Sequence, residues 1–166
     1  MNIPTSYHNL LDYKKKYPGD NDLARSKYDL DLAIALLQDK PDIVVCAGWM
    51  HILAHTFLDR LLSANVPVIN LHPALPGAYN GAGAIERAHQ DWLDGKIQKL
   101  GIMIHYVVLE VDTGEPILVE EIPFIKGVDE DLEKLKERIH KEENKIVVIG
   151  TKIAVERLRK PSTTGP

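Results

Sequence analysis

Val66-Pro-Val-Ile-Asn-Leu-His72 is the stretch that decides the fold, because an apolar run here ends in polar side chains. A second apolar run, Asp42-Ile-Val-Val-Cys-Ala-Gly48, precedes it, and such runs are typical of strands covered on both faces. A helical pattern over Leu53–Leu62 separates the two. This alternation predicts an α/β fold built on a mostly parallel sheet.

The sequence before these two strands has the pattern of one helix. Residues 3–17 are polar and mixed, and Pro18-Gly19 indicates a turn. Asp20 or Asp22 is then positioned to cap a helix. Its expected apolar face consists of Leu23, Leu30, Ala33, Ile34 and Leu37.

The chain after the strands predicts a change of architecture. A Pro/Gly-rich loop over 73–83 leads into a helix over Ala84–Leu93. Strands over Gly101–Leu109 and Ile117–Phe124 follow, joined by the hairpin signal Asp112-Thr-Gly-Glu-Pro116. We therefore expect antiparallel strands late in the sheet.

A long helical pattern closes the chain from Asp129 to Leu158. Its Glu130–Lys134 and Glu137–Lys141 spacings suit a solvated helix face. We expect one domain over 1–160 and a disordered tail over 161–166.

Composition narrows the class of protein. The chain has 166 residues, a net charge of −4 and a hydrophobic fraction of 45%. It shows no basic block, no apolar run of membrane-spanning length and no signal-peptide layout, so we expect no nucleic-acid or membrane partner. A single cysteine, Cys46, excludes an internal disulfide. These features predict a cytoplasmic, soluble protein.

Asn70 and His72 are the first candidates for chemistry. They lie two residues apart at the end of a strand, so their side chains point the same way. An amide and an imidazole can stabilise an oxyanion together. Asp112, in the hairpin turn, is the acidic neighbour expected to raise the pKa of the imidazole. The alternative interpretation is a capping Asn, a surface His and a turn-forming Asp.

Several motifs in order resemble the formyltransferase superfamily. Asn70-Leu-His-Pro73, followed by Leu75-Pro-Gly77, is similar to its active-site segment. Gly101-Ile-Met-Ile-His-Tyr106 with Val111-Asp-Thr-Gly-Glu-Pro116 resembles its second signature, and Gly48-Trp-Met-His-Ile-Leu53 its folate-binding segment. His105 and the Leu75–Gly81 loop are most similar to the phosphoribosylglycinamide formyltransferase (GAR transformylase) family, of eukaryotic or fungal type.

The resemblance implies a Rossmann-like formyltransferase fold and a reaction. The expected formyl donor is 10-formyltetrahydrofolate, and the acceptor is the amine of 5'-phosphoribosylglycinamide in de novo purine (IMP) biosynthesis. The implied catalytic residues are Asn70, His72 and Asp112. The implied folate-binding residues are Arg25, Met50, His51, Ile52, Leu53 and Asn70. The implied substrate-binding residues are Gly48, Met50 and Glu143, and no metal is implied.

The chain departs from the family pattern at its front. It starts inside the family domain, so about two N-terminal βα units, including the Gly-rich phosphate loop, are expected to be missing. His51 stands where many relatives have Arg. Two alternatives stay open: a truncated, non-catalytic folate-binding chain, or another superfamily member such as formyltetrahydrofolate deformylase. A homodimer is also left open.

Other chemistry is less favoured by the residues. His51 and His55 are four residues apart, but Ile52 stands where zinc proteases have Glu and no third ligand is evident. Cys46 lies inside an apolar run, which favours a buried residue over a nucleophile. His105 is expected to face the sheet and to be a supporting or packed residue rather than the base of a nucleophile.

Overall fold

The computed structural model describes residues 3–159 and divides the chain into two compact units. The first contains the residues up to Asp42 together with Ile52–Val66. The second contains Ile43–His51 and the chain from Pro67 onward. The tail predicted over 161–166 lies outside the described residues. No helix of the described chain is both long and apolar enough to cross a membrane.

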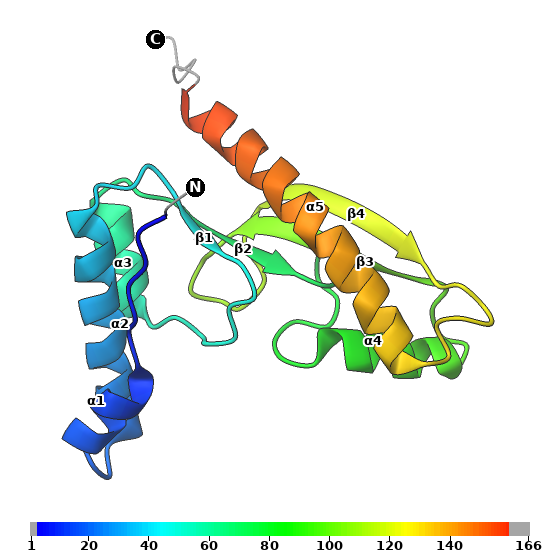
Figure 1. Cartoon of the computed structure of the whole chain (residues 1–166), viewed down its shortest axis with the longest axis horizontal. Coiled ribbons are helices and arrows are strands. Elements are labelled where there is room, and N and C mark those ends of the chain that lie inside the picture. The colour runs from blue at the N-terminus through cyan, green and yellow to red at the C-terminus, as the bar shows by residue number, and fades with distance from the viewer. Residues whose placement is uncertain (1–2, 160–166) are drawn as a thin grey trace. The chain divides into compact units, whose positions relative to one another are not determined.

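The first unit consists of three helices (Figure 1): α1 (Leu10–Lys16), α2 (Asn21–Gln38) and α3 (His55–Ser63). As predicted, Asp20 caps α2, and its side chain accepts a hydrogen bond from the Leu23 amide. The sequence did not predict α1, a short helix capped by Asn9. Seven residues with one apolar pair carry too little periodicity to reveal it.

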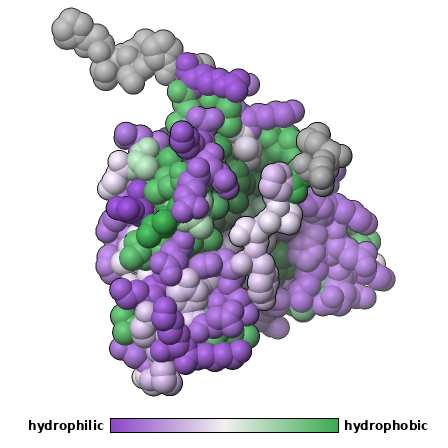
Figure 2. Space-filling model, turned by 60° about the vertical axis from the view of Figure 1, so that its left-hand side comes forward, coloured by the Kyte–Doolittle hydropathy of each residue, from purple (hydrophilic) through white to green (hydrophobic). Residues whose placement is uncertain are grey.

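The predicted apolar face of α2 is largely wrong. Of the five residues expected there, only Ala33 is buried, and Leu23 and Ile34 are exposed. The buried face instead carries Ala24, Tyr28, Asp29 and Ala33. Polar and apolar residues alternate around α2 without a sharp boundary, so periodicity alone could not identify the face that packs. Figure 2 shows hydrophobic residues breaking up an otherwise polar surface.

The second unit is built on a four-stranded sheet in the order β1-β2-β3-β4. Its strands are β1 (Val44–Cys46), β2 (Val68–His72), β3 (Lys99–Tyr106) and β4 (Pro116–Pro123). β1 pairs with β2 in parallel, whereas the β2–β3 and β3–β4 pairs are antiparallel. The α/β class and the late antiparallel strands are confirmed, and the parallel part of the described sheet is the β1–β2 pair.

Strand β1 differs from the expectation of a strand covered on both faces. It is three residues long, and the Val45 side chain is 37% exposed. β1 also forms one edge of the described sheet. Apolar composition predicted the strand but could not reveal that it lies at an edge.

Two helices complete the second unit: α4 (Ala84–Leu93), whose bounds match the prediction, and α5 (Leu132–Arg159). In Figure 1, α5 runs across β3 and β4, which it contacts. A Cβ on Gly150 would lie 2.6 Å from Cγ1 of Ile104, so glycine lets helix and strand approach closely. The core joins sheet and helix through Ile69, Ile102, Ile104, Leu135, Ile139, Ile146 and Ala154.

Helix α5 begins later than predicted. Asp129 precedes the helix and is fully buried, where its carboxylate accepts from the Ile125 amide and from Arg138. Glu130 therefore lies outside α5 and cannot form the predicted helical pair. Neither Glu130–Lys134 nor Glu137–Lys141 is among the ion pairs of the described residues, in which Lys136 pairs with Glu133 instead.

Candidate active site

Asn70 and His72 lie at the end of β2, as the sequence predicted. Asn70 is paired with Cys46 of β1 on one side and with His105 of β3 on the other. This position between two strands holds its backbone rigidly. The His72 side chain is buried, with 4% of the residue exposed. The interpretation of His72 as a surface histidine is therefore wrong.

Asp112 reaches both residues from the loop between β3 and β4. Its Oδ2 atom lies 3.3 Å from Nδ1 of His72, and its Oδ1 atom accepts from Nδ2 of Asn70 at 3.4 Å. The Asp112 side chain is 8% exposed. The predicted trio is thus brought together from two distant parts of the second unit.

A tight backbone turn makes this approach possible. Asp112 has a φ of 59°, in the left-handed region that short polar side chains tolerate best. Two residues later, a Cβ on Gly114 would lie 1.7 Å from the carbonyl oxygen of Tyr106. Only glycine fits at that position, so Gly114 determines how closely the Asp112 loop follows β3.

His105 is a fourth member of the cluster. Its Nδ1 atom donates to the carbonyl of Tyr106 at 2.9 Å, because a carbonyl can only accept. Its Nε2 atom then faces Asn70 Nδ2 at 3.3 Å and Asp112 Oδ1 at 3.4 Å. The supporting role expected for His105 is consistent with this position.

The backbone of the 73–83 loop supplies a further contact that sequence reasoning missed. The Gly81 amide donates to Oδ2 of Asp112 at 2.8 Å. This is shorter than the contacts of Asp112 with His72, His105 or Asn70. A backbone donor has no side-chain signature, so no motif could have revealed it.

Burial and charge act in opposite directions on the imidazole of His72. Burial lowers the pKa of His72 below its ordinary value and outweighs the Asp112 carboxylate, which raises it. The expected effect of Asp112 is present, but the predicted net rise in pKa is wrong. Removing the nearly enclosed ring from water destabilises its charged form more than the Asp112 carboxylate, 3.3 Å away, stabilises it.

The carboxyl group of Asp112 stays ionised for the complementary reason. Burial alone would raise its pKa, but the hydrogen bond from the Gly81 amide and the adjacent His105 and His72 rings lower it below the ordinary value. An ionised Asp112 facing Nδ1 of neutral His72 places the imidazole proton on Nδ1. The Nε2 atom then presents a lone pair.

Nε2 of His72 is the reactive atom that this arrangement leaves available. Within the described chain it is buried without a hydrogen-bond partner of good geometry. The backbone of Ala78 and Tyr79 acts on the pKa of the ring in the opposite direction to burial and favours its protonated form. A buried, unpaired ring nitrogen can accept a proton and later return it, which is the behaviour of a general acid–base.

The predicted folate-binding residues fall into both compact units. In the second unit, Met50 is 83% exposed, and nearby Gly48, which was predicted to bind the acceptor instead, has a φ of 62°. In the first unit, Nη2 of Arg25 donates to the carbonyl of Ile52 at 3.0 Å. Two residues of the predicted set are therefore in contact. Leu53 follows in the first unit, and His51 ends the second unit's segment beside Trp49.

Glu143, the predicted acceptor-binding residue, lies on α5 of the second unit. Its side chain is 17% exposed, and burial raises the pKa of its carboxyl group. Nε2 of His140 lies 3.9 Å from its Oε2 atom. A shielded carboxyl group of this kind can bind a cation or an amine.

The zinc site at His51 and His55 and a nucleophilic Cys46 were the less favoured interpretations of the sequence. His55 begins α3 while His51 lies before the helix, so the pair does not share a helical face. Among residues 3–159, no three His, Cys, Asp or Glu side chains are grouped to hold a metal ion. Cys46 is buried, as predicted, and burial raises its pKa to about 11. At neutral pH it is a thiol rather than a nucleophilic thiolate.

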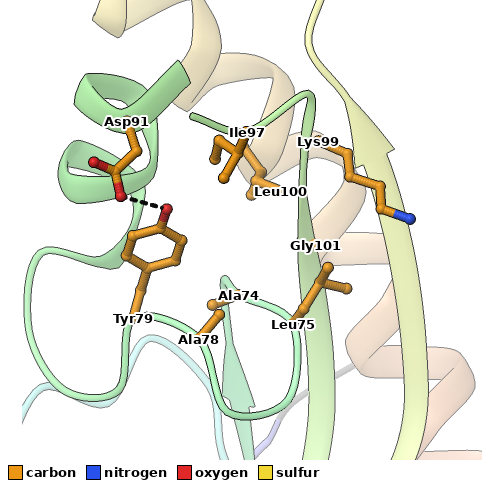
Figure 3. A pocket seen from close by; sticks show the side chains of 9 residues that line it. All are labelled: Ala74, Leu75, Ala78, Tyr79, Asp91, Ile97, Lys99, Leu100 and Gly101. Atoms are coloured by element: carbon orange, nitrogen blue, oxygen red, sulfur yellow. Dashed lines mark hydrogen bonds between the residues drawn. The ribbon is translucent and has the colours of Figure 1, made fainter. Parts of the chain in front are cut away.

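A cavity of about 330 Å³ lies beside the 73–83 loop, between α4 and the start of β3 (Figure 3). The hydroxyl of Tyr79 donates to Asp91 across it at 2.8 Å. The cavity is lined by Ala74, Leu75, Ala78, Tyr79, Asp91, Ile97, Lys99, Leu100 and Gly101. None of the predicted catalytic residues lines it, so it is distinct from the trio's site.

The matching family, two similar proteins and one similar solved structure all have the names of formyltransferases. Residues 10–150 match the family described as formyl transferase. A phosphoribosylglycinamide formyltransferase of Schizosaccharomyces pombe is 48% identical over 146 residues, 88% of this chain and 69% of that protein. One from Dictyostelium discoideum is 46% identical, over 91% and 73%. The crystal structure of the Streptococcus pneumoniae enzyme aligns with a TM-score of 0.69 and 28% identity, covering 79% of this chain and 68% of that one.

Proposed function

The chain belongs to the formyl transferase family, and on that premise we propose that it transfers a formyl group from 10-formyltetrahydrofolate to the amine of 5'-phosphoribosylglycinamide. The step belongs to de novo purine (IMP) biosynthesis. The observation that carries the proposal is the buried, unpaired Nε2 of His72, held beside an ionised Asp112. The names of the relatives from Schizosaccharomyces pombe and Dictyostelium discoideum favour this reaction over donor hydrolysis.

His72 is the proton carrier in the proposed reaction. The bound folate supplies the formyl carbon, which the acceptor amine attacks. Nε2 of His72 takes a proton as the new C–N bond forms, and returns one to the nitrogen that leaves. Asp112 faces Nδ1 and stabilises the imidazolium that exists between these transfers.

Asn70 is proposed to stabilise the oxyanion that forms when the amine adds to the formyl group. Its Nδ2 contacts with His105 and Asp112 are long, at 3.3 and 3.4 Å. Such contacts orient the amide while leaving it able to make a shorter bond to a charged oxygen. His105 would support Asn70 in that orientation.

The two substrates are assigned to different residues. We propose that Arg25 and the segment Met50, His51, Ile52 and Leu53, with Asn70, bind the folate. Gly48, Met50 and Glu143 are proposed to meet the acceptor. The shielded carboxyl group of Glu143 suits the amine of that substrate. The reaction as proposed requires no metal.

We also propose that the protein is cytoplasmic, that its partners are small molecules, and that residues 1–160 form a single formyltransferase domain. Whether the protein forms a homodimer is a separate question that a sizing experiment answers.

Formyl transfer by the purified chain tests the proposal. Transfer from 10-formyl-5,8-dideazafolate to glycinamide ribonucleotide is followed by absorbance, with His72→Ala as the inactive variant. His55→Ala is the matched control, because His55 is exposed at the start of α3. Turnover that survives in His55→Ala and disappears in His72→Ala supports the proposal. Equal turnover in both variants, or loss of donor without formylated product, contradicts it.

A further inference from the structure

The position of the Asp112 carboxylate depends on a loop outside its own strand pair. The Gly81 amide donates to Oδ2 of Asp112 at 2.8 Å, and the same oxygen faces Nδ1 of His72 at 3.3 Å. Any movement of the backbone at Gly81 therefore changes the hydrogen bonding of the oxygen that orients His72.

This loop has a conformation that needs support. Tyr79, Gly81 and Gly83 all have a positive φ, of 51°, 81° and 68°. For the two glycines this is inexpensive, but for Tyr79 the left-handed region is unfavourable. The loop will keep this shape only if contacts from the surrounding structure hold it.

Arg87, in the first turns of α4, supplies such contacts. Its Nη2 atom donates to the carbonyl of Tyr79 and, at 2.8 Å, to that of Asn80. Its Nε atom donates to the carbonyl of Gly83 at 3.4 Å. The three carbonyls lie on both sides of Gly81 in the chain, so one guanidinium bridges the segment that carries the Gly81 amide.

A second contact, with Asp91, holds the Tyr79 side chain but does not bind the backbone of residues 80–83. The Tyr79 hydroxyl donates to Asp91, whose other oxygen pairs with Lys96 at 2.9 Å. Figure 3 shows this bond between the Tyr79 and Asp91 side chains at the cavity. The planar fork of Arg87 is therefore the described contact that joins both sides of Gly81.

We propose that Arg87 is a positioning residue for the reaction, because it holds the 79–83 loop so that the Gly81 amide stays on the Asp112 carboxylate. The kinetic part of this inference rests on the proposed function. The structural part does not, because it concerns a hydrogen bond that can be measured without turnover.

The test compares Arg87→Gln with wild type, with Arg60→Gln as the matched control. Arg60 is an exposed arginine on α3 in the other unit. In ¹⁵N-labelled protein, we expect Arg87→Gln to accelerate hydrogen exchange of the Gly81 amide roughly tenfold, the size of one lost charge-assisted bond. Arg87→Lys should give an intermediate rate, since an ammonium cannot bridge three carbonyls. Unchanged Gly81 exchange in both Arg87 variants overturns the proposal.

Kinetics provide the second readout. Arg87→Gln should lower kcat roughly tenfold with little change in KM for the folate, because a misplaced catalytic group costs rate rather than binding. A rise in KM with unchanged kcat would overturn the positioning role. If wild type shows no turnover, that result counts against the proposed function alone, and Gly81 exchange decides the inference. If Arg87→Gln does not fold by circular dichroism, Arg87→Lys carries both measurements.

Discussion

Oδ2 of Asp112 lies 3.3 Å from Nδ1 of His72, and both side chains are at least nine-tenths buried. At that depth the carboxylate fixes which ring nitrogen carries the proton, while burial keeps the ring neutral. The pair therefore presents Nε2 as a base in the resting protein.

Replacing Asp112 with Asn should lower kcat by ~10²–10⁴. A neutral amide no longer favours the proton on Nδ1 of His72 and no longer stabilises the imidazolium. Asp59→Asn, at an exposed aspartate of α3, is the control and should leave kcat unchanged. Steady-state formyl transfer measures both variants. Similar kcat values for Asp112→Asn and wild type would show that the carboxylate does not act on the imidazole.

The lowered pKa of His72 should make stability depend on pH in one direction. The folded protein binds this proton more weakly than the unfolded chain does, so the contribution is complete above the ordinary pKa of 6.5. It is lost as the pH falls through the lowered value in the folded state. Urea unfolding between pH 7.5 and 5 measures the effect.

The variant His72→Gln isolates this contribution from the other titrating groups. Its unfolding free energy should decline less on acidification than that of wild type, whereas His55→Gln should behave as wild type. A steeper decline in His72→Gln than in wild type would mean that the pKa of His72 is raised in the folded state.

Gly114→Ala should lower the free energy of unfolding more than Gly127→Ala does. The added Cβ would meet the Tyr106 carbonyl oxygen at 1.7 Å, so the Asp112 loop must move. At Gly127, where φ is 82°, there is space for the methyl group, and only backbone strain of about 1 kcal/mol is expected. Thermal unfolding of both variants gives the comparison, and equal losses would contradict the close approach.

Cys46 should react slowly with iodoacetamide while the chain is folded. Burial raises the pKa of its thiol to about 11, so at pH 8 the thiolate fraction falls roughly a hundredfold below that of an unfolded chain. Because the chain has a single cysteine, mass spectrometry reads this site directly. Labelling as fast in the folded protein as in 6–8 M urea, roughly the range that unfolds small domains, would show an accessible thiolate.

The sequence by itself determined the elements whose signals are local. Helix α4 has its predicted bounds, since a glycine precedes it and an apolar face runs through it. The late hairpin was evident from β-branched runs joined by a Thr-Gly turn. Asn70 and His72 were predicted as candidates from their place at the end of an apolar strand, and Asp112 from the turn that joins the last two strands.

Only the tertiary structure decided what depends on neighbours distant in sequence. The buried face of α2 and the exposure of Val45 follow from which elements pack against them, and residue order does not encode that locally. The pKa of His72 is lowered because desolvation scales with enclosure, whereas the sequence indicated only the nearby charge of Asp112. The Gly81 amide is itself a backbone group, and the guanidinium of Arg87 binds backbone carbonyls. Every residue has such groups, so no sequence pattern marks these contacts. Their role comes from geometry, and geometry exists only once the chain has folded.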